Sequence, residues 1–397
     1  MSGFWAMVLT MLAQIGVSGA TYVPPVIAPA LMPAMGLSFS AVGYFAVMTF
    51  LSAAVTGVYA VAMVRRHGPI RTCQFALLLA AIGSFLMALL QPWALYAGGV
   101  LIGAGLGQLN PASSDILART APPHRRALVF SIKQTGVPVA GALVGLASPF
   151  TVVHFGPVWA LVEIGVLCLV AMVGLEPQRA TLDTHRLPDT PWPSLRGVFA
   201  APMLAVLRHP ALRVLCVAVT VFSMVQNTVT AFLVSHLSGS LGWTLVEAGA
   251  GFSIALVAGV IGRIIWSLIA DRIGDGLPVL CGLSVAIALC AAAMVWPGPV
   301  TPHWPVLVLV ILFGATAVGW NGVYLAQVAR EVPQAEVALA TVGTLFFSYL
   351  AVLVGPLVYT AIATAGGTGV AYLAQVVPLV AVTVTLGAYL WRRRARR

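Results

Sequence analysis

Apolar runs long enough to cross a membrane recur along the whole chain. A spanning helix needs about 20 mostly apolar residues, and the sequence divides into about twelve such runs. The predicted spans lie near residues 5–30, 40–63, 72–90, 94–118, 127–149, 156–175, 211–236, 245–269, 277–296, 305–328, 337–362 and 368–391. The pattern therefore predicts an all-α membrane protein with twelve transmembrane helices.

Charged residues fall on alternate turns between these runs. Arginines follow every second run, at Arg65, Arg66, Arg119, Arg272, Arg330 and in the tail 392–397. The turns without any Lys, Arg, Asp or Glu lie near residues 31–40, 91–93, 237–243 and 297–304. Because cytoplasmic loops carry the excess of Lys and Arg, we expect a multi-pass protein of the cell inner membrane with both termini in the cytoplasm.

Composition supports this class. Hydrophobic residues make up 60% of the chain and charged residues 8%, whereas a soluble domain has roughly 25% charged residues. The net charge of +10 is spread over the predicted cytoplasmic loops, so lipid headgroups are the expected partner and nucleic acid is not. The five cysteines occur singly, without a Cys/His cluster, so we expect no metal site, disulfide framework or cofactor.

The one long polar stretch, residues 176–210, is predicted to be a cytoplasmic linker. It separates an N-terminal six-helix bundle (1–175) from a C-terminal one (211–397). The end of the linker, residues 195–207, is predicted to form an interfacial amphipathic helix.

The two halves repeat. Gly36, Arg66 and Gly68 match Gly242, Arg272 and Gly274 at one offset (242 − 36 = 206), and Gly103 and Asn110 match Gly314 and Asn321 at another (314 − 103 = 211). Parallel repeats with an even number of helices are related by an axis along the membrane normal, which is a transporter architecture.

Two helix starts are predicted from residue type. Ser38 and Thr244 each precede an apolar run, as N-cap residues do. Thr244 and Glu247 also have the spacing of a capping box, which favours a structural role for Glu247.

Residues 262–274, GRIIWSLIADRIG, resemble the loop motif G-x-L-A-D-R-x-G-R of the major facilitator superfamily. Ser267 replaces the first Gly of the motif and Asp275 its final Arg. In the first-half loop Arg65 stands where the family has Asp, and only Arg66 and Gly68 are kept. The resemblance covers the whole chain and implies two six-helix bundles related by a pseudo-twofold axis.

The resemblance also implies a cytoplasmic gate. Asp271 would dock onto the positive N-terminal end of a helix from the opposite half, predicted at 127–149, with Arg272 and Arg66 as further gate residues. Arg65 stands at the equivalent position of the first half, and a cation cannot make this contact with a positive helix end. The first-half gate contact must therefore be rebuilt or weak.

Asp115 is a further gate candidate with two interpretations. It either pairs with Arg66 or Arg71 in the gate network, or simply pairs with Arg119 at i+4.

Ionisable residues within spans are costly and mark pathways or paired structural sites. Lys133, the only lysine, and Arg263 lie at similar depths on the cytoplasmic side of the midplane. If the family's helix arrangement carries over, both face one cavity. No acid is an obvious partner for both, so we expect an anionic substrate. The alternative is that each side chain snorkels to the headgroups or caps a helix end.

The spacing of Arg263 and Asp271 resembles the eighth helix of monocarboxylate and oxalate/formate carriers, in which an arginine holds the substrate carboxylate. A guanidinium suits this role because it binds a carboxylate with two parallel hydrogen bonds. Oxalate-type carriers add a lysine in the eleventh helix, whereas residues 341–360 here carry no charge. Lys133 is a candidate substitute.

Polar and aromatic residues near mid-helix complete the expected site, or serve as interhelical hydrogen-bonding groups. They are Gln14, Gln108, Gln226, Asn227, Trp266, Asn321, Tyr324 and Tyr349. The adjacent pair Gln226 and Asn227 is the stronger ligand candidate. Asn110 and Asn321 are candidates for repeat-symmetric interhelical contacts. Glu163 is either a proton-coupling carboxyl kept neutral by burial or a hydrogen-bonded structural acid.

The sequence thus predicts a monomeric secondary transporter that moves a small organic anion by alternating access, with proton coupling as a further possibility. The alternative is a proton-driven exporter of hydrophobic drugs or metabolites, against which the absence of an acid in the first helix counts. A ligand sensor would need a signalling domain that the chain lacks. No nucleophile–base set, metal cluster or phosphate loop indicates an enzyme.

Overall fold

A computed structural model describes residues 3–120, 126–184, 186–192, 203–204, 206–333 and 336–395, without the side chains of 3–4, 118–119, 126–131 and 337–339. The described residues form helices and turns, with no strand among them. Their contacts divide the chain into two compact units, unit 1 (Met1–Ser194) and unit 2 (Leu195–Arg397). Most of the predicted amphipathic helix at 195–207 lies outside the described residues.

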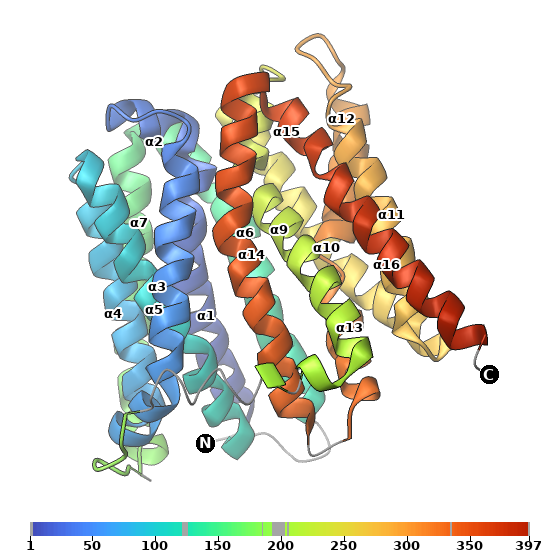
Figure 1. Cartoon of the computed structure of the whole chain (residues 1–397). Coiled ribbons are helices and arrows are strands. Elements are labelled where there is room, and N and C mark those ends of the chain that lie inside the picture. The colour runs from blue at the N-terminus through green and yellow to red at the C-terminus, as the bar shows by residue number, and fades with distance from the viewer. Residues whose placement is uncertain are drawn as a thin grey trace. The chain divides into compact units, whose positions relative to one another are not determined.

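The described residues of unit 1 form six long helical segments, which are drawn from blue to green in Figure 1. They are α1 (Gly3–Val26) with the short α2 (Ala28–Ala34), α3 (Ala41–His67), α4 (Pro69–Met87), α5 (Pro92–Thr120), α6 (Arg126–Phe155) and α7 (Pro157–Leu182). Helix α1 packs against α5, α6 and α7, while α5 packs against α3 and α4. Helix α7 continues through the first seven residues of the predicted linker.

Among the described residues, unit 2 also has six long segments, two of them broken. They are α9 (Pro210–Gly239), α10 (Leu245–Ile273), α11 (Gly276–Ala293), α12 (His303–Ala317) with α13 (Asn321–Glu331), α14 (Val337–Gly366), and α15 (Thr368–Ala374) with α16 (Val376–Ala395). The prediction of an all-α membrane fold is confirmed.

Eleven helices among the described residues are long and apolar enough to cross a membrane. Helix α5 is the remaining long segment of unit 1, and its second half carries Gln108, Asn110, Ser113, Ser114 and Asp115. Polar residues in a span face protein or water rather than lipid, so α5 is a candidate for the functional face of unit 1.

The predicted repeat is visible in the backbone and the packing. Gly68 and Gly274 both end a helix with positive φ, at 94° and 75°. Gly103 of α5 lies against the backbone of Thr49 in α3, and Gly314 of α12 lies in the same way against Ala255 of α10. The contact partners keep the first offset (255 − 49 = 206), so both units use equivalent glycines where two helices approach closely.

One of the two predicted N-caps is wrong. Thr244 accepts a hydrogen bond from the Glu247 amide, and the Glu247 carboxylate accepts one from the Thr244 amide, so the capping box is confirmed. Helix α3 instead begins at Ala41 without a side-chain cap, and the Ser38 hydroxyl pairs with that of Ser40 at 2.7 Å. The serine hydroxyls satisfy each other and not the helix end.

Replacing Gly103 with Ala would place a methyl group against the Thr49 backbone, which cannot move as a flexible side chain can. We expect the Gly103→Ala variant to lose about 1–3 kcal/mol of stability through overpacking. The matched control is Gly174→Ala in α7, where an added Cβ meets no atom within 4 Å. Thermal unfolding in detergent should show a lower melting temperature for the first variant only, and equal melting temperatures would contradict the close approach.

Candidate substrate site and gate residues

Lys133 is buried inside unit 1 with its ammonium group hydrogen bonded to an amide. Its side chain is 1% exposed, and Nζ donates to Asn110 Oδ1 at 2.6 Å and at longer range to Gln134 Oε1 at 3.5 Å. Within the part of the chain that the structure describes, Lys133 has no carboxylate partner. The cation of α6 is therefore held by neutral groups alone.

The ammonium group points toward the middle of unit 1. Lys133 lies seven residues after the start of α6, about 10 Å along the axis, whereas Asn110 lies ten residues before the end of α5, about 15 Å from the same end. A lysine that snorkels would extend the opposite way, toward the helix end. This geometry favours the site interpretation of Lys133 over the snorkelling one.

Two glutamines of the predicted site lie on α1 and α5. Gln14 of α1 is fully buried, its Nε2 donates to Ser18 Oγ at 2.9 Å, and its side chain contacts Gly136, one turn beyond Lys133 on α6. Gln108 of α5 is 9% exposed. The Oε1 atoms of both glutamines are buried and have no hydrogen-bond partner among the described residues. Neither amide is fully used within unit 1.

In unit 2 the predicted residues of α10 pack against α12 and α13. Trp266 donates its indole N–H to the carbonyl of Ala315 at 2.9 Å. Arg263 is half-buried, and its aliphatic stem lies next to Gly322 of α13. The Trp266 indole N–H is thus used for helix packing, while its ring is half-exposed.

Amide pairing joins α9 to the break between α12 and α13. Asn321 Nδ2 donates to Gln226 Oε1 at 3.1 Å, and Asn227 Nδ2 donates to the carbonyl of Ser223 in its own helix at 2.9 Å. The predicted ligand pair therefore already has partners within unit 2. Tyr324 is buried beside Trp320, whereas Tyr349 of α14 is 47% exposed.

The predicted gate residue Asp271 forms an ion pair within its own unit. Arg330 Nη2 lies 3.1 Å from Asp271 Oδ1, while Arg272 is exposed. A shallow pocket beside this pair is lined by residues of α10, α11 and α13, among them Ser267, Gly276 and Gln327. The exposed ion pair joins the end of α10 to α13.

In unit 1 the gate candidate Arg66 contacts the segment that follows α7. Its guanidinium lies over the Trp192 ring at 4.7 Å, and the Leu187 amide donates to the carbonyl of Arg65 at 2.7 Å. Residues 186–192 are thereby fastened to the end of α3. Asp115 is half-buried on α5, and the side chain of its alternative partner Arg119 lies outside the described residues.

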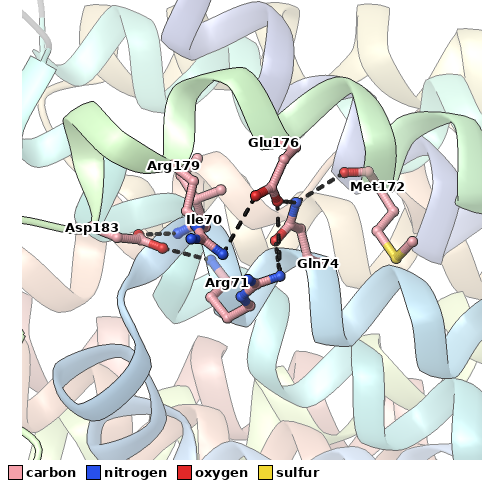
Figure 2. A network of polar contacts seen from close by, with 7 residues as sticks. All are labelled: Ile70, Arg71, Gln74, Met172, Glu176, Arg179 and Asp183. Carbon is pink, nitrogen blue, oxygen red and sulfur yellow. Dashed lines mark hydrogen bonds and ion pairs between the residues drawn. The ribbon is translucent and has the colours of Figure 1, made fainter.

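Helix α4 begins at Gly68–Pro69, which offers no capping side chain, and a remote carboxylate supplies the missing acceptors (Figure 2). The amides of Ile70 and Arg71 donate to Asp183 Oδ1 and Oδ2 at 2.8 and 3.1 Å. Asp183 is 2% exposed, and a Cβ at Gly68 would overlap its carboxylate. Burial raises the pKa of the Asp183 carboxyl, and the two amide donors oppose this shift.

A second layer of contacts joins the same two helices (Figure 2). Gln74 Nε2 donates to Glu176 Oε2 at 2.8 Å and to the Met172 carbonyl at 3.1 Å, and Arg71 donates to Gln74 Oε1 at 3.1 Å. Glu176 also pairs with Arg179 at 3.4 Å and with Arg71 at 3.8 Å. Arg71, one of the two predicted partners of Asp115, is thus held by Glu176.

In unit 2 other residues supply the hydrogen-bond acceptors at the start of the equivalent helix, α11. At the start of α11 the Gly276 amide donates to Gln327 Oε1 at 2.7 Å, and the Leu277 amide donates to Asp275 Oδ1 at 3.1 Å. Arg393 of α16 then pairs with Glu331 at 2.8 Å and with Asp275 at 3.8 Å. Sequence reasoning missed Asp183 and Gln327, although the α4 start at Gly68–Pro69, which has no capping side chain, indicates that a remote acceptor is needed there.

Glu163 of α7 is exposed and accepts a hydrogen bond from the Thr151 hydroxyl of α6 at 2.9 Å. Burial, which the proton-coupling interpretation requires, is not seen. The contact joins two neighbouring helices and supports the structural interpretation of this acid.

The model of the Major Facilitator Superfamily matches residues 7–349, while no curated protein sequence matches the chain significantly. A crystal structure of a mutant of the nucleoside transporter NupG has a TM-score of 0.80 at 13% identity and covers 97% of this chain and 98% of its own. An inward-facing, occupied bacterial homologue of the human lysosomal transporter Spinster has a TM-score of 0.77 at 15% identity, covering 98% and 96%. The peptide transporter POT in complex with sulfate has a TM-score of 0.75 at 15% identity, covering 98% and 94%.

Removing the carboxylate of Asp183 would leave two amides at the α4 start without an acceptor in a buried position. We expect Asp183→Ala to cost about 1–2 kcal/mol of stability, as for the loss of other helix caps. The control is Asp189→Ala, because Asp189 lies exposed in the same segment. Thermal unfolding of both purified variants measures this difference, and an unchanged melting temperature in Asp183→Ala would refute the capping role.

Proposed function

The chain belongs to the major facilitator superfamily, and on this premise we propose that it carries a small organic anion, most simply a carboxylate, across the inner membrane by alternating access. The observation that carries the proposal is the Lys133 ammonium, buried at 1% exposure with only amide oxygens as partners. The structurally similar transporters are named for nucleosides, peptides and a lysosomal protein, so the shared fold does not select a substrate.

A buried charge without an opposite charge nearby is costly, because nothing offsets the free energy lost on removing it from water. An incoming carboxylate would supply that charge. The ammonium group has three donors, of which Asn110 takes one at short range, so at least one is free for a substrate oxygen. Asn110 itself is exposed, so the ammonium lies directly beneath the accessible surface of unit 1.

Arg263 is the second cation of the proposal, and it belongs to unit 2. Its guanidinium can bind a carboxylate through two parallel hydrogen bonds, which a lysine cannot. Asp271 and Arg330 form the cytoplasmic gate contact of unit 2 in this proposal, because their ion pair is exposed and can break when the unit moves. Both chain termini are then cytoplasmic, as the arginine distribution indicates.

The first test is a thermal-shift screen of the purified protein against small carboxylates, with Lys133→Gln and Arg263→Gln beside it. A ligand that binds the native state raises the melting temperature, by the equivalent of about 2.7 kcal/mol at 100 times Kd. We expect this stabilisation in the wild-type protein and in the control Arg394→Gln, an exposed tail residue, and its loss in both site variants. Stabilisation only by hydrophobic cations or neutral drugs, retained in both site variants, would instead favour the exporter.

Proton symport is a separate part of the proposal. We expect an inside-alkaline pH gradient to stimulate uptake of the identified anion into proteoliposomes. Glu163→Gln should keep this stimulation, because Glu163 is exposed and bonded to Thr151. Loss of the stimulation in this variant would assign the proton to Glu163, and a wild-type protein that ignores the gradient would contradict symport.

A further inference from the structure

His236, near the end of α9, differs from the other two histidines of unit 2 because no described acid lies beside it. The Nε2 atom of His209 lies 3.1 Å from Glu336 Oε2 at the α9 start. The Nδ1 atom of His303 lies 3.8 Å from Glu247 Oε1. His236 is 1% exposed. A proton on either of the other histidines would therefore create an ion pair, whereas a proton on His236 would create a buried charge without a counterion.

The His236 ring lies where the ends of α9, α11 and α15 meet. Its Nδ1 atom pairs with the Thr368 hydroxyl of α15 at 2.7 Å, and the ring of Tyr372 in α15 packs against it edge-on, with centroids 5.2 Å apart. The Met294 carbonyl at the end of α11 faces the ring but lies outside hydrogen-bond geometry, so Nε2 is buried without a hydrogen bond to the described residues. One hydrogen bond thus fastens the imidazole to the start of α15.

The ionisable side chains around His236 are phenols. Tyr372 is fully buried, Tyr359 of α14 is 2% exposed, and their ring centroids lie 5.1 Å apart. Helix α12 brings the apolar Phe313 against Tyr372, and Glu247 of α10 is used in the capping box of its own helix. Within the described part of unit 2, the helices around the ring therefore bring no carboxylate to it.

Two hydroxyls connect the buried ring to the surface of unit 2. The Thr368 hydroxyl, which is bonded to Nδ1 of His236, also pairs with the Ser240 hydroxyl at 2.6 Å, and both of these residues are half-buried. A hydroxyl accepts and donates at the same time. A proton from water can therefore bind to Ser240, whose own proton moves to Thr368, whose proton in turn moves to Nδ1. The ring gains one proton and the solvent loses one, and the bundle does not have to open first.

We propose that His236 and the Thr368 hydroxyl form a proton-operated latch between α9 and α15, at the outer end of unit 2 in the proposed topology. With a neutral ring the latch is closed, because Nδ1 is paired and the tyrosine rings cover the imidazole. A protonated ring carries a charge that no described residue balances, so opening this end is favoured because water then hydrates the imidazolium. The acidity of the outer solution thereby controls the opening, whatever substrate is carried.

Hydrogen–deuterium exchange of the purified full-length protein in detergent tests the latch, because exchange reports local opening. Exchange is measured at about pH 8 and about pH 5.5, with labelling times scaled for the intrinsic effect of pH on exchange. We expect peptides covering 232–240 and 367–375 to exchange about tenfold faster at the lower pH. The reason is that a hydrated histidine, with an ordinary pKa near 6.5, is then about ten times more often protonated than neutral.

Two variants fix the latch in its two states. His236→Asn keeps an amide near the position of Nδ1 but cannot take up a proton, so exchange of both peptides should be equal at the two pH values. Thr368→Val removes the hydroxyl, so exchange should already be about threefold to tenfold faster than in the wild type at the higher pH. His209→Asn, at the opposite end of α9, is the matched control and should keep the wild-type response.

The latch is overturned if wild-type exchange at these peptides ignores pH, or if His236→Asn responds to pH as the wild type does. Wild-type exchange in Thr368→Val would overturn it as well, so the test stands even where His236→Asn does not fold. None of these results bears on the proposed anion carrier, because the measurement contains no ligand.

Discussion

Backbone hydrogen bonding is the constraint on which the architecture depends, because a helix that starts inside a tightly packed bundle cannot rely on water for its free amides. Helix α4 follows α3 after the single residue Gly68, which leaves no room for a capping side chain. Asp183, more than 100 residues further along the chain, supplies the missing hydrogen-bond acceptors. Asp183 also precedes the segment that contacts Arg65 through Leu187 and Arg66 through Trp192, so α3, α4, α7 and residues 186–192 are held together around this cap.

Lys133 differs from the other charged residues in how its charge is paired. The ion pairs of the described residues lie near helix ends, join an arginine or histidine to an acid, and are partly exposed, so each adds little. Lys133 is deeply buried, and its partners among the described residues are amides. A structural role would be served better by an apolar residue of similar volume, which would avoid the desolvation cost. The proposed anionic ligand would supply the opposite charge that the described residues do not bring to Lys133.

Much of the fold was predictable from the sequence, because each spanning helix is marked by an apolar run and the turns between the runs alternate in charge. The repeat was predictable too, since Gly68 and Gly103 sit where positive φ or close approach excludes other residues, and Gly274 and Gly314 repeat them. The Ser38 cap failed because a nearby hydroxyl competes for the same oxygen. Residue type identified Lys133, but only the structure shows its partner and the direction of its head group. Asp183 was missed because its partners are backbone amides, which no side-chain pattern reveals.

The two units preserve the repeat in backbone geometry while exchanging the chemistry at its equivalent positions. At the α4 start, acids come from the α7 end and the base Arg71 from α4 itself. At the α11 start the acid Asp275 precedes the helix and the base Arg393 comes from α16. The glycine positions are fixed by close contacts that leave no room for a side chain. A helix start, in contrast, needs only a hydrogen-bond acceptor, and an ion pair needs only two opposite charges. Because these partners can be chosen freely, the two halves were able to diverge at their helix ends while their glycines stayed in place.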